Sequence, residues 1–137
     1  MLLVIDTNII VSAIKSGIKK DSNGNTIYTK AYKLMKDVFI GKHKMVVSSE
    51  IIAEYEDVLH RPYLQLDQIK VDKFLSFVKY TAIWIEPLPT TQSQVEMKDE
   101  DDRIFFDVAK CLNIKLVTGN LKHYPVHELR TKIDELY

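Results

Sequence analysis

The apolar positions of this chain form four short runs that lie between polar and helical segments. These runs predict strands at residues 2–5, 44–48, 82–85 and 115–118. Short runs of aliphatic and β-branched residues are typical of strands that are buried on both faces of a sheet. The first run stops at Asp6, the second at Ser48 and the fourth at Thr118. We therefore expect strands whose carboxyl ends carry polar side chains.

Apolar residues recur at helical spacing in the remaining segments, at 9–14, 31–39, 51–59, 71–78 and 104–112. Ser48 and Asp67 are suited to cap two of these helices, and Pro62 ends or bends one of them. The polar segment 15–27 has a strong turn signal at 21–25, which predicts a small hairpin or a mobile loop. Residues 126–137 predict a helix, with a short strand through 130–133 as the alternative.

The predicted strands alternate with predicted helices along the whole chain. This order indicates an α/β fold, a three-layer α/β/α sandwich with a mainly parallel sheet of four to five strands. No internal repeat and no linker interrupts the sequence. We therefore expect residues 1–137 to form a single domain.

Charge and cysteine content narrow the class of protein. The chain has 19 basic and 19 acidic residues, which argues against a surface that is positive everywhere. Residues 1–50 hold eight lysines and four acids, and this excess indicates either a local phosphate-contacting flank or a solvated surface. Cys111 is the single cysteine, and no apolar run approaches the roughly 18 residues of a membrane span. We expect a cytoplasmic protein that does not enter a membrane.

Acidic residues occur where the predicted strands meet the following helices. Asp6 follows the first strand, Glu54 lies early in the helix after the second, and Asp102 closes an acidic run that opens another helix. Asn120 follows the last of the four strands. Asp6 alone could be a helix cap, and acids at a helix start also complement its dipole. Because the carboxyl ends of parallel strands share one edge, the set predicts a common site for a hard cation, Mg²⁺ or Mn²⁺. No spacing of Cys and His suggests zinc.

The missing motifs exclude other classes of enzyme. The sequence has only four glycines and contains neither a glycine-rich phosphate loop nor a Gly-x-Ser-x-Gly elbow. Bound Mg²⁺ or Mn²⁺ acidifies a water molecule and neutralises charge on a phosphate. Phosphodiester hydrolysis is therefore the leading prediction.

The acidic positions and their neighbours resemble the PIN-domain ribonucleases, of the kind that serve as toxins in VapBC-type toxin–antitoxin pairs. The matching segments are residues 5–8, 48–54, 101–109 and 116–120, in the order in which the family has them. By this resemblance Asp6, Glu54 and Asp102 are the metal-coordinating acids, and Thr7, Asn8 and Thr118 are supporting polar residues.

The sequence departs from the family pattern in two respects. Many members have a further aspartate directly after Thr-Gly or three residues beyond, where this chain has Asn120 and His123. Asn120 can offer a carbonyl oxygen or hold a metal-bound water, and Asp101 or Asp99 can replace the missing acid. His123 is either a catalytic group or an ordinary surface histidine. The C-terminal tail also looks short for a family that often ends with a further strand and helix.

The resemblance implies a metal-dependent endoribonuclease that cleaves RNA, binds a cognate antitoxin protein and forms a homodimer. In this interpretation Asp6, Glu54, Asp102 and Asn120 form the catalytic set. Three lysines near the N-terminal loop are candidates to hold the flanking RNA phosphates: Lys15, Lys19 and Lys20. The alternative is a catalytically weakened PIN domain that acts as an RNA-binding or protein-binding module.

Overall fold

The computed structural model of the chain describes residues 1–16, 18–119, 121–124 and 129–137. The strands are β1 Leu2–Ile5, β2 Ile18–Lys20, β3 Thr26–Tyr28, β4 Lys44–Val47, β5 Ile83–Trp84, β6 Lys115–Val117 and β7 Arg130–Thr131. The helices are α1 Thr7–Ser16, α2 Lys30–Phe39, α3 Ser49–Leu59, α4 Gln68–Thr81, α5 Arg103–Leu112 and the short α6 Ile133–Leu136. Three 3₁₀ turns, η1 Pro62–Leu64, η2 Glu100–Asp102 and η3 Leu121–His123, join them.

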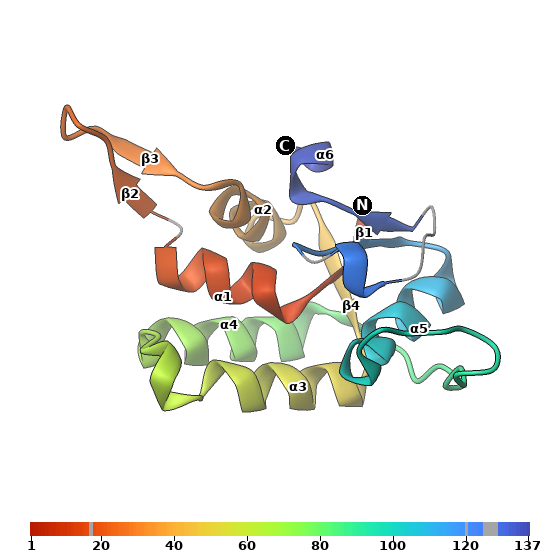
Figure 1. Cartoon of the computed structure of the whole chain (residues 1–137). Coiled ribbons are helices and arrows are strands. Elements are labelled where there is room, and N and C mark those ends of the chain that lie inside the picture. The colour runs from red at the N-terminus through yellow and green to blue at the C-terminus, as the bar shows by residue number, and fades with distance from the viewer. Residues whose placement is uncertain (17, 120, 125–128) are drawn as a thin grey trace.

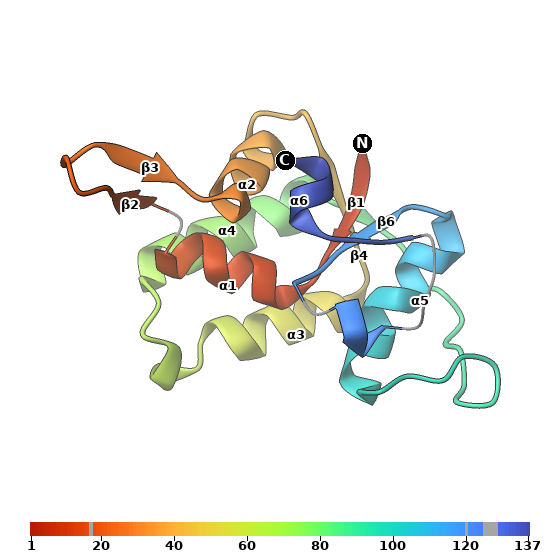
Figure 2. The same ribbon diagram turned by 45° about the horizontal axis from the view of Figure 1, so that its top comes forward.

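Five strands form the main sheet in the order β5-β4-β1-β6-β7, and all of its neighbouring pairs are parallel. In Figure 2 the helices α1, α2 and α4 lie on one side of this sheet and α5 lies on the other. The strand β1 is central, and Leu3, Val4 and Ile5 are fully buried because helices cover both faces. The predicted α/β fold with a mainly parallel sheet is confirmed. No helix in the described ranges is long and apolar enough to cross a membrane.

The predicted helix starts at Ser48 and Asp67 are confirmed by their side-chain hydrogen bonds. The Ser48 hydroxyl accepts a hydrogen bond from the Ile51 amide, and the Asp67 carboxylate accepts one from the Ile69 amide. Each bond satisfies an amide that has no partner within its own helix, so the two side chains set where α3 and α4 begin. This also sets where Glu54 lies relative to the end of β4.

The polar segment after α1 forms a hairpin of β2 and β3 that projects from the body of the molecule (Figure 1). The Asp21 carboxylate accepts hydrogen bonds from the amides of Asn23 and Asn25, and Gly24 has a φ of +81°. This turn requires a glycine at its left-handed position. Of the two sequence predictions for this segment, the hairpin is confirmed.

At the end of the chain the alternative prediction of a short strand is confirmed at Arg130–Thr131, and the predicted helix is limited to Ile133–Leu136. Residues 125–128 lie outside the described ranges, and the following residues pair with β6 as the strand β7. The amides of Leu116 and Thr118 donate to the carbonyls of Leu129 and Thr131. Pairing with the open edge of β6 satisfies these backbone groups, whereas a helix there would leave that edge bare. Although the tail is short, it forms both a strand and a short helix.

Candidate functional site

The carboxyl ends of β1 and β6 bring Asp6 and Thr118 together. The Asp6 amide donates to the Val117 carbonyl at 2.9 Å, which aligns the two strand ends. One carboxylate oxygen of Asp6 accepts hydrogen bonds from the Thr118 hydroxyl at 2.8 Å and from the Tyr124 hydroxyl at 3.0 Å. Asp6 is only 6% exposed, and this burial raises its pKa although the hydrogen bonds act in the opposite direction.

Asp6 also lies at the start of α1, as the capping interpretation expects. The amides of Thr7 and Asn8 stabilise its ionised carboxylate. The capping role and the role in a site are therefore compatible, because one carboxylate has enough lone pairs for both.

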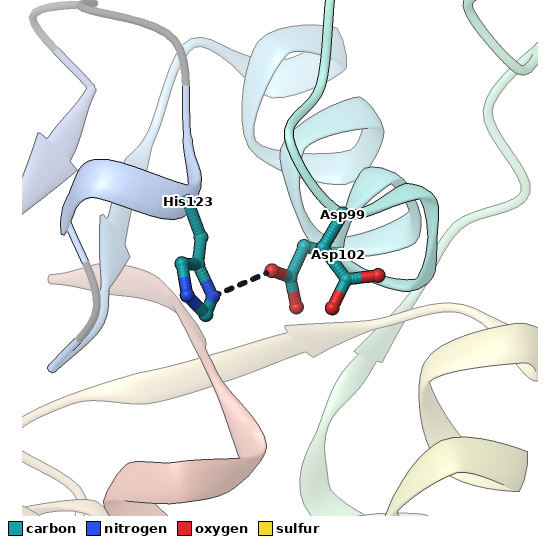
Figure 3. Close-up of side chains that lie close together, drawn as sticks. All are labelled: Asp99, Asp102 and His123. Atoms are coloured by element: carbon teal, nitrogen blue, oxygen red, sulfur yellow. Dashed lines mark ion pairs between the residues drawn. The ribbon is translucent and has the colours of Figure 1, made fainter.

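Asp102 enters the same region from the start of α5. Burial first, and then the charges of Asp6 and Asp99, raise the pKa of Asp102 to about 6. Its Oδ2 atom is buried and has no hydrogen-bond partner among the described residues. The Nδ1 atom of His123 approaches this oxygen to 3.3 Å as a charge contact (Figure 3). A buried carboxylate oxygen that lies beside other acids and has one imidazole as its neighbour is suited to bind a cation.

Asp99 completes the tightest group of ligand-type side chains among the described residues. One ligand atom each from Asp99, Asp102 and His123 lies within 4.8 Å of the others. Figure 3 shows His123 on η3 facing the two carboxylates, which come from the start of α5 and the loop before it. The sequence predicts Asp99 either as part of a helix start or as a replacement for the missing acid, and it leaves two roles open for His123. The signal that could have found His123 is its position three residues after Asn120.

Glu54 lies at the margin of this group. Burial raises the pKa of Glu54, Arg61 opposes that rise, and the charges of Asp101 and Asp6 add to it. The charge of Asp6 is thus one of several that raise the pKa of Glu54, and Glu54 does not belong to the group within 4.8 Å.

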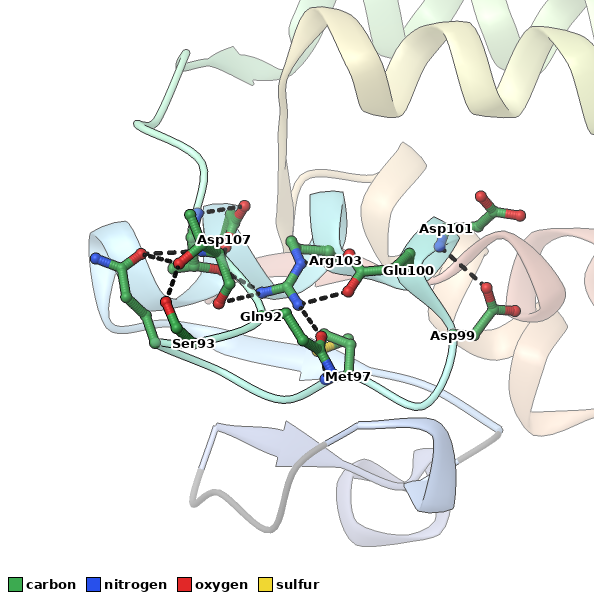
Figure 4. A network of polar contacts seen from close by, with 11 residues as sticks. Gln92, Ser93, Met97, Asp99, Glu100, Asp101, Arg103 and Asp107 are labelled. Carbon is green, nitrogen blue, oxygen red and sulfur yellow. Dashed lines mark hydrogen bonds and ion pairs between the residues drawn. The ribbon is translucent and has the colours of Figure 1, made fainter.

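The acidic residues just before α5 make different contacts. The Asp99 carboxylate accepts a hydrogen bond from the Asp101 amide, and Glu100 forms an ion pair with Arg103 (Figure 4). Asp101 is exposed, whereas Asp102 is half-buried and faces Asp6. Asp102 is thus the acid of this run that faces the carboxylate after β1.

The supporting residues lie beside Asp6. The Thr7 hydroxyl is buried without a hydrogen-bond partner among the described residues, and the Asn8 side chain accepts a hydrogen bond from the Gly119 amide at 3.4 Å. Asn120, predicted to be catalytic, lies outside the described residues.

The structure places the three N-terminal lysines away from the acids. Lys15 lies in the last turn of α1, and Lys19 and Lys20 lie on β2. The 10 residues of α1 separate them from Asp6 by about 15 Å along the helix axis.

The donor set fits a divalent cation. Burial is the largest cause of the raised pKa values of Asp6, Glu54 and Asp102, and a bound cation would offset that cost by stabilising the ionised carboxylates. Oxygen ligands of this kind are those of Mg²⁺ and Mn²⁺, and one adjacent imidazole is compatible with Mn²⁺.

Fold and site together define a parallel α/β protein with a cluster of acidic side chains at the carboxyl edge of its sheet. The sequence model described as "PIN domain" matches residues 2–122, and the chain therefore belongs to the PIN domain family. A comparison with curated proteins gives no match.

A solved structure shares the whole fold. It is a crystal structure of VapBC2 from Rickettsia felis, bound to a DNA fragment from the promoter of that pair. The likeness has a TM-score of 0.57 and covers 96% of this chain and 98% of the other, at 19% identity. At this identity the likeness supports the fold.

Proposed function

We propose that this PIN domain is a divalent-metal-dependent endoribonuclease that hydrolyses RNA phosphodiester bonds, as the toxin of a toxin–antitoxin pair. The observation that carries the proposal is the burial of Asp6 and Asp102 at one sheet edge, with raised pKa values. Two carboxylates so placed repel each other unless a proton or a cation relieves the repulsion. Family membership and the likeness to VapBC2 favour nucleic-acid chemistry at such a site.

In the proposed mechanism, Asp6, Glu54 and Asp102 hold Mg²⁺ or Mn²⁺, and Asn120 offers an amide oxygen or positions a water. A bound ion of this kind supplies an acidified water and charge neutralisation at the phosphate. The hydroxyls of Thr118 and Tyr124 orient the Asp6 carboxylate. Both hydroxyls bond the same oxygen of Asp6, so the other oxygen would be available to help hold the ion.

The remaining polar residues support the same set in this proposal. The His123 imidazole orients Asp102 through the 3.3 Å contact. Thr7 and Asn8 line the start of α1 beside Asp6, and Asp101 adds negative charge near Glu54. Such outer groups fix the direction of metal-binding carboxylates.

The test is cleavage of a panel of single-stranded and hairpin RNAs with Mn²⁺. We expect Asp6→Asn and Asp102→Asn to reduce the cleavage rate by at least about 100-fold, because each removes a charged ligand. The matched control is Asp72→Asn, which removes an exposed acid on α4 and should cut like the parent. Unchanged cleavage by both site variants would show that the site is elsewhere.

A catalytically weakened module predicts a different result. In that case no RNA of the panel is cut, and calorimetric titration at neutral pH detects no Mn²⁺ binding. Binding of Mn²⁺ that is lost in Asp102→Asn would instead support the enzyme.

The proposal includes a partner protein and a second copy of the chain. A groove of about 510 Å³ lies between α1, α2 and α4, with apolar walls that include Ile14, Met35 and Phe74. Four lysines border it: Lys15, Lys36, Lys70 and Lys73. An antitoxin segment with apolar and acidic side chains complements such a groove. The homodimer rests on family analogy, and sedimentation tests it.

A further inference from the structure

A second cleft, of about 490 Å³, opens directly beside the acidic group. Its walls come from the loop before η2, from α5 and from η3. The volume lies within the range of about 300 to 1,000 Å³ that is usual for ligand sites. These three segments come from separate parts of the sequence, so the cleft exists only in the folded chain.

Positive charge dominates this cleft. Lys98 enters it from the loop, Lys110 from α5 and Lys122 from η3, and all three are exposed. Glu96 is the acidic residue of the lining. None of these lysines forms an ion pair with a residue in the described part of the chain. Three free ammonium groups around one hollow complement an anionic chain such as a row of phosphates.

The cleft shares a wall with the acidic site. His123 lines the cleft and contacts Asp102 at 3.3 Å, and Tyr124 lines the cleft and donates its hydroxyl to Asp6 at 3.0 Å. His123 and Tyr124 therefore form a boundary that the cleft shares with the acids, so an RNA strand whose scissile phosphate lies at the acids has the cleft directly beside it. Phe106 lines the cleft four residues before Lys110, on the same face of α5.

The loop that carries Lys98 is held to α5 by a buried arginine. The Arg103 guanidinium donates to Glu100, to the Thr90 hydroxyl at 2.8 Å and to the Gln92 side chain at 2.7 Å (Figure 4). The Gln92 side chain also accepts a hydrogen bond from the Met97 amide. Because these bonds fix the loop before any ligand arrives, its lysine is positioned in advance.

We propose that this cleft, rather than the N-terminal lysines, binds the RNA strand adjacent to the scissile phosphate. Lys98, Lys110 and Lys122 contact successive phosphates, and the hollow beside Phe106 receives one nucleoside. Because the contacts are to the backbone, the cleft binds single-stranded RNA without strong sequence preference. The inference rests on the proposed function, since it takes the acids as the place of cleavage.

The test measures RNA binding in the Asp102→Asn background, where cleavage does not interfere. The probe is a fluorescently labelled single-stranded RNA, and anisotropy is recorded at several salt concentrations. We expect replacement of Lys98, Lys110 and Lys122 by alanine to weaken binding at least about tenfold and to lower the salt slope by about 2, as for three lost phosphate contacts. The matched variant replaces Lys15, Lys19 and Lys20 by alanine and should change the affinity by less than about threefold. Equal losses in both triples, or no loss in the first, would overturn the inference.

A second experiment separates this inference from the proposed function. In the active protein, the cleft triple should raise KM with kcat unchanged, because it weakens substrate binding and leaves the acids intact. If the parent cuts no RNA but its RNA binding depends on the three cleft lysines, the proposed function is wrong and the proposal that the cleft binds RNA is supported. If polyglutamate displaces the RNA at equal charge concentration, the cleft binds acidic protein and the inference fails. Circular dichroism melting confirms that each triple is folded.

Discussion

Asp102 shows how a residue of the proposed site affects the stability of the folded protein. Its pKa of about 6 lies above the ordinary 3.8, so the folded protein binds more protons than the unfolded chain between these values. The free energy of unfolding therefore falls as pH rises from about 4 to 6 and stays low above that range. A group with such a raised pKa destabilises the metal-free protein at neutral pH, and the cation of the proposed site would offset this cost.

We predict that Asp102→Asn stabilises the metal-free protein at pH 7.5 by roughly 1 to 3 kcal/mol, since the amide carries no charge to desolvate. Urea unfolding in EDTA at pH 5 and at pH 7.5 measures this. The parent should be more stable at the lower pH, and the difference should shrink in the variant. Added Mn²⁺ should stabilise the parent and not the variant. A parent that gains stability as pH rises over this interval would contradict the prediction.

A second prediction concerns the hydroxyl of Tyr124. Its hydroxyl donates to Asp6, and burial raises its own pKa well above the ordinary value, so the proton stays on the tyrosine. We expect Tyr124→Phe to lower Mn²⁺ affinity about 10- to 100-fold, because Asp6 loses one of the groups that orient it. Calorimetry measures the affinity, with the exposed Tyr80→Phe as control. Equal affinities in the two variants would rule out the positioning role.

Among the elements, the loop between β5 and η2 depends most on one side chain. Arg103 is only 7% exposed and makes its bonds to Thr90, Gln92 and Glu100 through a planar fork. We predict that Arg103→Lys costs about 2 kcal/mol, because an ammonium group cannot reproduce this geometry. Urea unfolding measures the loss, and amide hydrogen exchange of residues 90–99 should become faster.

The control for this change is Arg61→Lys, which alters an exposed pair with Asp57 and should cost less than about 0.5 kcal/mol. Unaltered exchange in the loop of Arg103→Lys would mean that other contacts hold it.

Most elements could be predicted from local pattern alone. Helix starts at Ser48 and Asp67 depend on hydrogen bonds within a few residues, so sequence spacing is enough to place them. For β7 the local pattern left strand and helix as alternatives, because its partners on β6 lie 14 residues earlier in the chain, as in the pair Leu116 and Arg130. Whether a short segment forms a strand or a helix depends on whether it meets an open sheet edge with which it can pair.

At the scale of the whole molecule, the groove between α1, α2 and α4 carries the prediction about partners. We expect the double variant Lys36→Glu, Lys73→Glu to lose co-purification with the product of a neighbouring small reading frame, because the reversed charges repel an acidic segment. Co-expression with a tag on one partner measures this. Lys110→Glu, which lies in the other cleft, is the matched control. Retention of the partner by the double variant would place the interface elsewhere.

The amino-acid sequence alone predicts the α/β class, the order of elements, and Asp6, Glu54 and Asp102 as candidate site residues. These predictions are possible because buried strands and capped helices leave local patterns, and because parallel strands must end at a common edge. Three contacts are visible only in the folded chain: Tyr124 donates to Asp6, His123 and Asp99 lie beside Asp102, and three lysines from separate elements line one cleft. These contacts join residues that are distant or have no periodic pattern, and only packing of the whole chain brings them together.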